Sequence, residues 1–276
     1  MTHLRMRKLG SILLPVLFVY GVGGVVHAQG SEWEKLNGEV VGLYKQGNYD
    51  QAIEVAKKAL QVAEQTAGSD SPSVATSLNN LAMLHQAKDE YAEAEPLYQR
   101  ALAINEKVRG PDHPDVATSL HNLAALYSAQ ELFDKAVPLS KRALAIDELA
   151  FGPEHPRITT SLNNLATLYL AQGQFVQAES LYKRILRIHE QAFGPNHPAV
   201  AKSWDDLGLL YQAQKQYAEA EPFHKRALEI WKQALGPDHA RVAITLEHLA
   251  NLYRETDREK EAQEVAEQAA AIRATQ

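Results

Sequence analysis

Cysteine is absent from the sequence, which excludes disulfide bonds, thiol catalysis and zinc or iron–sulfur sites held by cysteine. Glycine and proline are scarce, at 15 and 12 of 276 residues, and much of each recurs at fixed intervals. A strong charge of either sign is also lacking, since the formal net charge is −6. Hydrophobic residues make up 45% and charged residues 22% of the chain, a composition that allows a packed core and argues against wholesale disorder.

The N-terminus has the layout of a secretory signal peptide. Three basic residues precede an apolar stretch from Leu9 to Val26, and the small residue Ala28 follows. An uncleaved membrane anchor is the alternative, because an apolar run of about 18 residues is marginal for spanning a bilayer. We expect cleavage after Ala28, with residues 1–28 as signal peptide, and an exported protein that is periplasmic or secreted. A membrane contact is expected only if residues 9–26 stay attached.

Cleavage would remove three basic residues and no acidic one, which moves the formal net charge from −6 to −9. A mildly acidic protein is poorly suited to bind a phosphate backbone. We therefore expect no nucleic-acid partner.

The rest of the chain repeats with a period of 42 residues. The glycines that mark this period are Gly68, Gly110, Gly152, Gly194 and Gly236. Each is followed by a short turn sequence, as in Gly110-Pro111-Asp112-His113-Pro114, which recurs almost unchanged in the next two copies. A fixed period over five copies indicates a tandem array of one structural unit.

Each unit carries two amphipathic helical patterns. In the first, Leu120, Leu123, Ala124 and Tyr127 form one apolar stripe of a helix. A polar turn and a second helical pattern follow, and two such helices cannot bury their apolar faces without neighbouring units. Proline breaks the second pattern at three positions, where we expect a kink or an early 3₁₀ turn: Pro96, Pro138 and Pro222.

These repeats resemble the tetratricopeptide repeat, in the 42-residue variety found in kinesin light chains. The residues that carry the resemblance include Leu162, Leu165, Ala166, Tyr169, Ala178 and Tyr182. The resemblance covers about residues 33–272 and implies an all-α, right-handed superhelical solenoid of about six antiparallel helix pairs. Residues 29–66 are interpreted as a degenerate capping repeat and residues 67–276 as the tandem 42-residue repeats.

Nothing in the sequence predicts catalysis. There is no nucleophile–base arrangement, no phosphate-binding loop and no pair of catalytic carboxylates, so we expect no enzyme, no cofactor and no small-molecule substrate. Four histidines invite a metal interpretation: His113, His155, His197 and His239. Because they occur once per repeat, they should lie far apart along the array, whereas metal ligands must converge within about 2 Å of one ion. We expect them to cap or pack against the next helix start, and we expect no metal.

A second ladder is basic, on the second helices: Arg100, Arg142, Arg184 and Arg226. A functional ridge that binds anions is one interpretation. We favour a solvated face with ion pairs between repeats, to residues such as Glu93, Glu95 and Glu179, each worth about 0–1 kcal/mol.

The third ladder is polar and lies on the first helices, away from the leucines that face the partner helix. It supplies the candidate peptide-binding residues Asn79, Asn80, His121, Asn122, Asn163, Asn164, Lys202, Asp205, Asp206 and His248. Asparagine is a poor helix former, and its amide offers both a donor and an acceptor to a peptide backbone. The resemblance implies the same role, since tetratricopeptide grooves use an asparagine at the position of Asn80 to contact ligand. The alternative is that these amides bond between adjacent units and stiffen the array.

The late part of this ladder is more acidic, with Asp205, Asp206 and Glu247 against Lys202 and Arg254, and it favours a partner with a basic residue. It departs from the basic clamp that some relatives use for carboxylate-ended peptides. Trp231 is a candidate hot spot, because Asn105, Asp147 and His189 occupy its place in earlier units. Packing against the last helix pair is the alternative for this tryptophan.

The sequence thus predicts an exported scaffold or adaptor that binds a protein or an extended peptide in the concave groove of the array. One alternative is a structural or self-assembling module. Another is a non-catalytic accessory subunit of an envelope enzyme complex.

Overall fold

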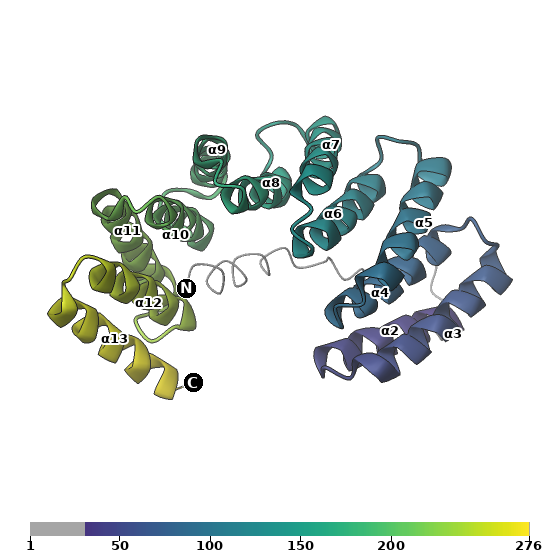
Figure 1. Cartoon of the computed structure of the whole chain (residues 1–276), viewed down its shortest axis with the longest axis horizontal. Helices are drawn as coiled ribbons and strands as arrows, with labels where there is room; N and C mark the ends of the chain where they lie inside the picture. The colour runs from purple at the N-terminus through teal and green to yellow at the C-terminus, as the bar shows by residue number, and fades with distance from the viewer. Residues whose placement is uncertain (1–30, 276) are drawn as a thin grey trace. The chain divides into compact units, whose positions relative to one another are not determined.

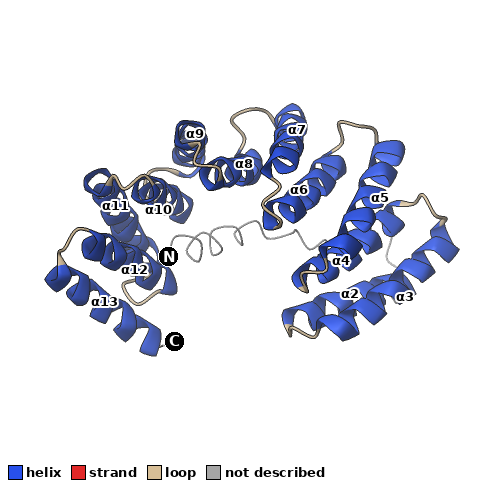
Figure 2. Ribbon diagram, viewed as in Figure 1, coloured by secondary structure: helices blue, strands red, loops and turns tan. Residues whose placement is uncertain are grey.

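The computed structural model describes residues 31–275. Over this range the chain forms twelve α-helices and one 3₁₀ turn, joined by short loops and without a strand (Figure 2). The predicted signal peptide, residues 1–28, lies outside the described residues. The all-α class and the six helix pairs are confirmed (Figure 1).

The chain divides into two compact units, 1–153 and 154–276. The described part of the first unit holds three helix pairs: α2 (Glu32–Lys45) with α3 (Tyr49–Ala67), α4 (Pro72–Ala87) with α5 (Tyr91–Arg109), and α6 (Pro114–Ala129) with α7 (Phe133–Phe151). Within this unit each helix packs against the helix before it and the helix after it.

The second unit holds the 3₁₀ turn η2 and three further pairs. Their bounds are η2 (Pro156–Ile158) and α8 (Thr159–Ala171) with α9 (Phe175–Phe193), α10 (Pro198–Ala213) with α11 (Tyr217–Leu235), and α12 (Ala240–Glu255) with α13 (Glu259–Ala274). In every pair the first helix carries the candidate ladder or its equivalent positions. The arginine ladder lies on the second helices α5, α7, α9 and α11.

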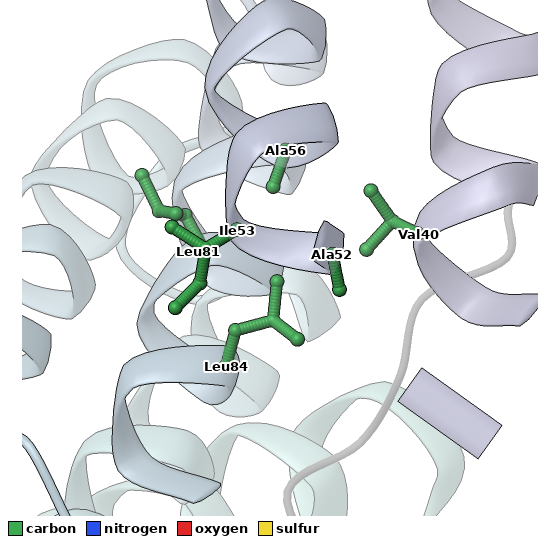
Figure 3. Close-up of a cluster of buried hydrophobic side chains, with 6 residues drawn as sticks. All are labelled: Val40, Ala52, Ile53, Ala56, Leu81 and Leu84. Carbon is green, nitrogen blue, oxygen red and sulfur yellow. The ribbon is translucent and has the colours of Figure 1, made fainter. Parts of the chain in front are cut away.

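The core is made between helix pairs as much as within them. Figure 3 shows Val40 of α2 and Ala52 of α3 close to Leu81 and Leu84, which come from α4 of the next pair. Aliphatic side chains from three helices therefore share one buried cluster. A single pair would leave much of this surface in water.

Small residues set how closely the two helices of a pair approach. One position of the second helix is alanine in all six pairs and is fully buried: Ala52, Ala94, Ala136, Ala178, Ala220 and Ala262. A larger side chain at this position would force the helices apart or into strained rotamers, which typically costs about 1–3 kcal/mol.

Glycine ends each second helix up to α11 for a conformational reason. Gly110 has φ 89° and ψ 158°, a backbone conformation that is essentially restricted to glycine. The other periodic glycines share it, with φ between 83° and 95°. The chain can therefore turn sharply into the next unit.

The periodic histidines are helix N-caps. Nδ1 of His113, His155, His197 and His239 accepts a hydrogen bond from the backbone N–H two residues later, at 3.1 Å in each case. Ser71 has the same place in an earlier repeat, and its hydroxyl accepts from Val74 N. The sequence prediction that these histidines cap the following helix is confirmed.

The expected interruption at the prolines is wrong as far as a 3₁₀ turn is concerned. Helices α5, α7 and α11 continue as α-helix through Pro96, Pro138 and Pro222. All three prolines are exposed on their helices, where packing does not constrain the local distortion of the backbone. The 3₁₀ turn of the described range lies elsewhere, at the start of α8.

The last pair is fastened by an ionic clamp. The Glu221 carboxylate of α11 accepts from Arg258 at 2.6 Å and from the Tyr253 hydroxyl at 3.0 Å, and it pairs with Lys225 at 2.7 Å. The bond from Arg258, helped by Lys225 and Tyr253, outweighs burial and lowers the pKa of Glu221 to about 2. The Arg258 guanidinium also lies 4.2 Å from the centre of the Tyr253 ring.

None of the helices between residues 31 and 275 combines the length and the apolar character needed to cross a membrane.

The caps predict the outcome of a matched pair of substitutions at His239. His239→Ala removes the acceptor at the start of α12 and should lower the free energy of unfolding by about 0.5–2 kcal/mol. His239→Ser should keep most of the stability, because serine caps the equivalent helix start at Ser71. Urea unfolding followed by circular dichroism measures both. Equal losses in the two variants would contradict the capping role.

Candidate functional site

The ten candidate residues lie on the first helices α4, α6, α8, α10 and α12, and they differ in exposure. Lys202 is exposed, and five others are half-buried: His121, Asn163, Asn164, Asp206 and His248. Four are buried: Asn79, Asn80, Asn122 and Asp205. The face that they define is more accessible in the second unit than in the first.

In the first unit, one of the amides bonds between helix pairs. Asn80 Nδ2 donates to Asn37 Oδ1 of α2 at 2.9 Å, and Asn37 Nδ2 donates to the Trp33 carbonyl at 2.8 Å. This is the stiffening role that the sequence left open as an alternative. His121 Nε2 lies 3.6 Å from Asp147 Oδ2, which belongs to the second helix of the same pair.

In the second unit, the ladder residues Asp205 and His248 meet a histidine that the sequence did not single out as functional. Asp205 Oδ1 lies 2.6 Å from His224 Nδ1 and Asp205 Oδ2 lies 3.0 Å from His248 Nδ1. His224 is fully buried, and its Nε2 lies 2.8 Å from Gln212 Oε1. We name Asp205, His224 and His248 the histidine–aspartate cluster.

His224 replaces a tyrosine of the repeat pattern. Tyr98 stands 126 residues earlier and donates its hydroxyl to Gln86, the equivalent of Gln212. Gly208 makes room for the imidazole ring, since a Cβ there would lie 2.5 to 2.7 Å from three of its ring atoms. Gly208 and His224 face each other, and both depart from the repeat pattern. This joint departure is the feature of the sequence that could have revealed the cluster.

The carboxylates of this region are neutralised within the protein. Burial alone would raise the pKa of Asp205, but the hydrogen bonds from His224 and His248 outweigh it and hold the pKa well below the usual range. Asp206 pairs with Lys202 at 2.5 Å, although burial raises its pKa. Glu247 pairs with Arg273 at 2.6 Å, which lowers its pKa. Because Asp205, Asp206 and Glu247 already have partners within the protein, they do not favour a binding partner with a basic residue.

Two arginines of the ladder form ion pairs between repeats, with other partners than we expected, and Arg226 pairs with Glu229 of its own helix. Arg100 pairs with Glu64 and Arg142 with Glu106, each 36 residues earlier. The expected partners Glu95 and Glu179 instead accept from tyrosine hydroxyls of the next first helix, Tyr127 and Tyr211, at 2.6 and 2.7 Å. Arg100 and Arg142 thus link successive second helices, and these tyrosines link a first helix to the second helix before it.

Trp231 is buried, with 6% of its surface exposed, and the Arg241 guanidinium of α12 lies 5.9 Å from its ring. It packs against the last pair, so an exposed anchor at this position is excluded. Thr245, which follows Trp231 by 14 residues, corresponds to Ser119 and Ser203, whose hydroxyls form hydrogen bonds with Asn105 and His189 at the same separation. The tryptophan replaces that donor, and Thr245 Oγ1 is buried without a hydrogen-bond partner among the described residues.

Stacked helix pairs with a fixed turn chemistry define a tandem helical-repeat protein. The model of the family described as tetratricopeptide repeat matches residues 40–107, 73–149, 129–191, 157–223 and 200–275. The chain belongs to the tetratricopeptide repeat family, and its repeats are of the kinesin-light-chain-like type.

Solved structures agree with this assignment. A crystal structure of nearly identical repeats of a putative kinesin light chain from Podosopora anserina is 27% identical, with a TM-score of 0.67 over 76% of this chain and 99% of that one. BtubC (BKLC) from P. vanneervenii is 24% identical, with a TM-score of 0.66 over 89% of this chain and 92% of that one. The apo form of RapI is 13% identical, with a TM-score of 0.62 over 88% and 98% of the two chains, and it shares the fold alone. No curated protein matches the sequence.

The unbonded hydroxyl of Thr245 predicts a stabilising substitution. Thr245→Val keeps the shape and removes a buried polar group whose burial costs about 1–3 kcal/mol, so the urea midpoint should rise. Ser203→Ala is the matched control one repeat earlier. It strands His189 Nδ1 and should lower the midpoint, because that hydroxyl lies 2.8 Å from it. A lower midpoint for Thr245→Val would contradict this account of the site.

Proposed function

We propose that the protein is an exported, non-catalytic scaffold that binds a protein or an extended peptide on the face of its first helices. Family membership supports the general class, since proteins built from these repeats are generally non-catalytic scaffolds. The solvent-accessible first-helix face of the second unit carries the specific proposal.

On this face, polar side chains recur at the same position of successive helices. Thr160 of α8 and Lys202 of α10 are exposed at equivalent positions, and Asn163 and Asn164 lie half-buried beside them. Helix α9 packs against both α8 and α10, and α11 packs against α10. A segment that runs across α8 and α10 would meet hydroxyl, amide and ammonium groups in turn, which suits hydrogen bonding to a peptide backbone.

In the first unit the polar residues at the same positions are mostly buried between helices. Asn79, Asn80 and Asn122 are buried there, and they present less surface to a ligand than Asn163, Asn164 and Lys202 of the second unit. We therefore place the binding face on α8 and α10, with Asn163, Asn164 and Lys202 as its central residues.

Position-specific photocrosslinking tests this placement. A photoreactive amino acid replaces Lys202 in one variant and Lys183 in the other. The two lysines are matched, since each is exposed and pairs with a carboxylate four residues away in its own helix. Crosslinking in the host cell followed by mass spectrometry should give a discrete adduct with a second protein from position 202 and none from position 183.

Equal adducts from both positions would contradict a binding face on the first helices. Adducts between two copies of this chain would favour the self-assembling module. Adducts with subunits of an envelope enzyme would identify the protein as an accessory subunit of that complex.

Export rests on the N-terminal sequence pattern and is also a proposal. The first described helix begins at Glu32, so cleavage after Ala28 would remove no residue of the helix pairs. Intact mass of the protein from its host should show a chain that starts at Gln29. Replacement of the small residue at the cleavage position by a bulky one, Ala28→Phe, should block processing. A wild-type chain that keeps Met1 in a membrane fraction would instead establish the membrane anchor.

A further inference from the structure

The histidine–aspartate cluster brings three potential metal ligands together inside the second unit. One nitrogen of each histidine and a carboxylate oxygen of Asp205 all lie within 4.8 Å of one another. They come from three helices: Asp205 from α10, His224 from α11 and His248 from α12. We propose that Asp205, His224 and His248 form a binding site for one divalent transition-metal ion such as Zn²⁺.

The ligand set and its spacing suit such an ion. Two imidazole nitrogens and one carboxylate oxygen are ligands that zinc accepts at about 2.0–2.2 Å, which places neighbouring ligand atoms about 3.3 Å apart in a tetrahedral site. The Asp205 oxygens lie 2.6 Å from His224 Nδ1 and 3.0 Å from His248 Nδ1. Both contacts of Asp205 are shorter than this spacing, so the oxygen and the two nitrogens would separate by less than about 1 Å along these contacts to admit the ion.

The surroundings orient the buried histidine as a ligand. Gln212 Nε2 donates to the carbonyl of His248 at 3.3 Å, so the Gln212 amide oxygen faces His224 and accepts from its Nε2–H at 2.8 Å. Binding of the ion would displace the proton that Nδ1 shares with Asp205, and the proton on Nε2 would stay hydrogen-bonded to Gln212, so that Nδ1 faces the ion. A fixed hydrogen bond from the other ring nitrogen is the usual way in which proteins orient a metal-binding histidine.

The site has access from one side. His224 is fully buried, whereas the side chains of Asp205 and His248 keep 12% and 22% of their surface exposed. An ion can reach the cluster past His248, and a water molecule can fill the fourth position.

The equivalent positions elsewhere in the described chain lack this ligand set. Asn37 and Asn80 stand where Asp205 and His248 stand, at the same separation of 43 residues, and Ala56 stands in place of His224. The site thus belongs to a single repeat. It is separate from the N-cap histidines, on which the expectation of no metal rested, and it does not depend on the proposed binding face.

The test uses the full chain, freed of metal with a chelator, and titrated with ZnCl₂ and CoCl₂ alone. We expect one ion per chain, a raised melting temperature with Zn²⁺, and visible Co²⁺ absorption bands of a low-symmetry site. Two ligand variants carry residues that the repeat already uses at these positions, His248→Asn and Asp205→Asn, so their helices should still form. Binding should be lost in both, while circular dichroism without metal stays unchanged.

Two further variants distinguish ion binding at the cluster from adventitious binding elsewhere on the protein. Gln212→Leu removes the hydrogen bond to His224 and should weaken Zn²⁺ binding about 10–100-fold. His239→Ser removes a histidine from the same helix as His248 but leaves the cluster intact, so its affinity should match the wild type.

The proposal is overturned if the wild type binds no Zn²⁺ at one equivalent, or if His248→Asn and Asp205→Asn bind as tightly as the wild type. It is also overturned if His239→Ser loses the ion, since binding would then belong to surface histidines.

Discussion

Close approach between helices is the constraint on which the fold depends. The alanine that recurs from Ala52 to Ala262 is fully buried in each pair, and it lets the two helices of that pair come together. Close packing within a pair leaves apolar residues such as Leu81 and Leu84 for the next pair, because each pair has too little surface to cover its own side chains. Stability therefore comes from contacts between neighbours, and the turns set the spacing at which those contacts repeat.

The helix pairs share one backbone structure, and substitutions at single positions give individual pairs different polar contacts. The amide pair of Asn37 and Asn80 joins adjacent first helices in the first unit, and the pair of Asp205 and His248 has the same place in the second. The change from a neutral pair to an ionisable one, with His224 behind it, turns a packing contact into a set of metal-ligand atoms. Family membership describes the backbone, whereas the particular function of this chain depends on such departures from the repeat.

The fold could be predicted from the sequence because its signal is periodic. A spacing of 42 residues, apolar stripes and glycine at each helix end were enough for six helix pairs, and the N-cap histidines followed from their place before each first helix. Side-chain partners across repeats could not be predicted in the same way. Arg100 reaches Glu64 rather than the nearer Glu93 or Glu95, and His224 reaches Asp205, because these contacts depend on how two helices are rotated against each other. The burial of Asn79 and Trp231 depends on the same rotation.

Near-identical repeats bring a hazard during folding, because any pair could dock on the wrong neighbour with almost the same backbone fit. The histidine–aspartate cluster removes that ambiguity for the C-terminal pairs. If α12 packed beside α4, His248 would meet Asn79, and Asp205 and His224 would be left buried without their third partner. Asp205 would keep its contact with His224 but lose the hydrogen bond to His248, and a lost partner of a buried polar group costs about 1–3 kcal/mol, so misaligned docking would be less favourable. The residues that make one repeat chemically distinct thus also specify the order in which the repeats assemble.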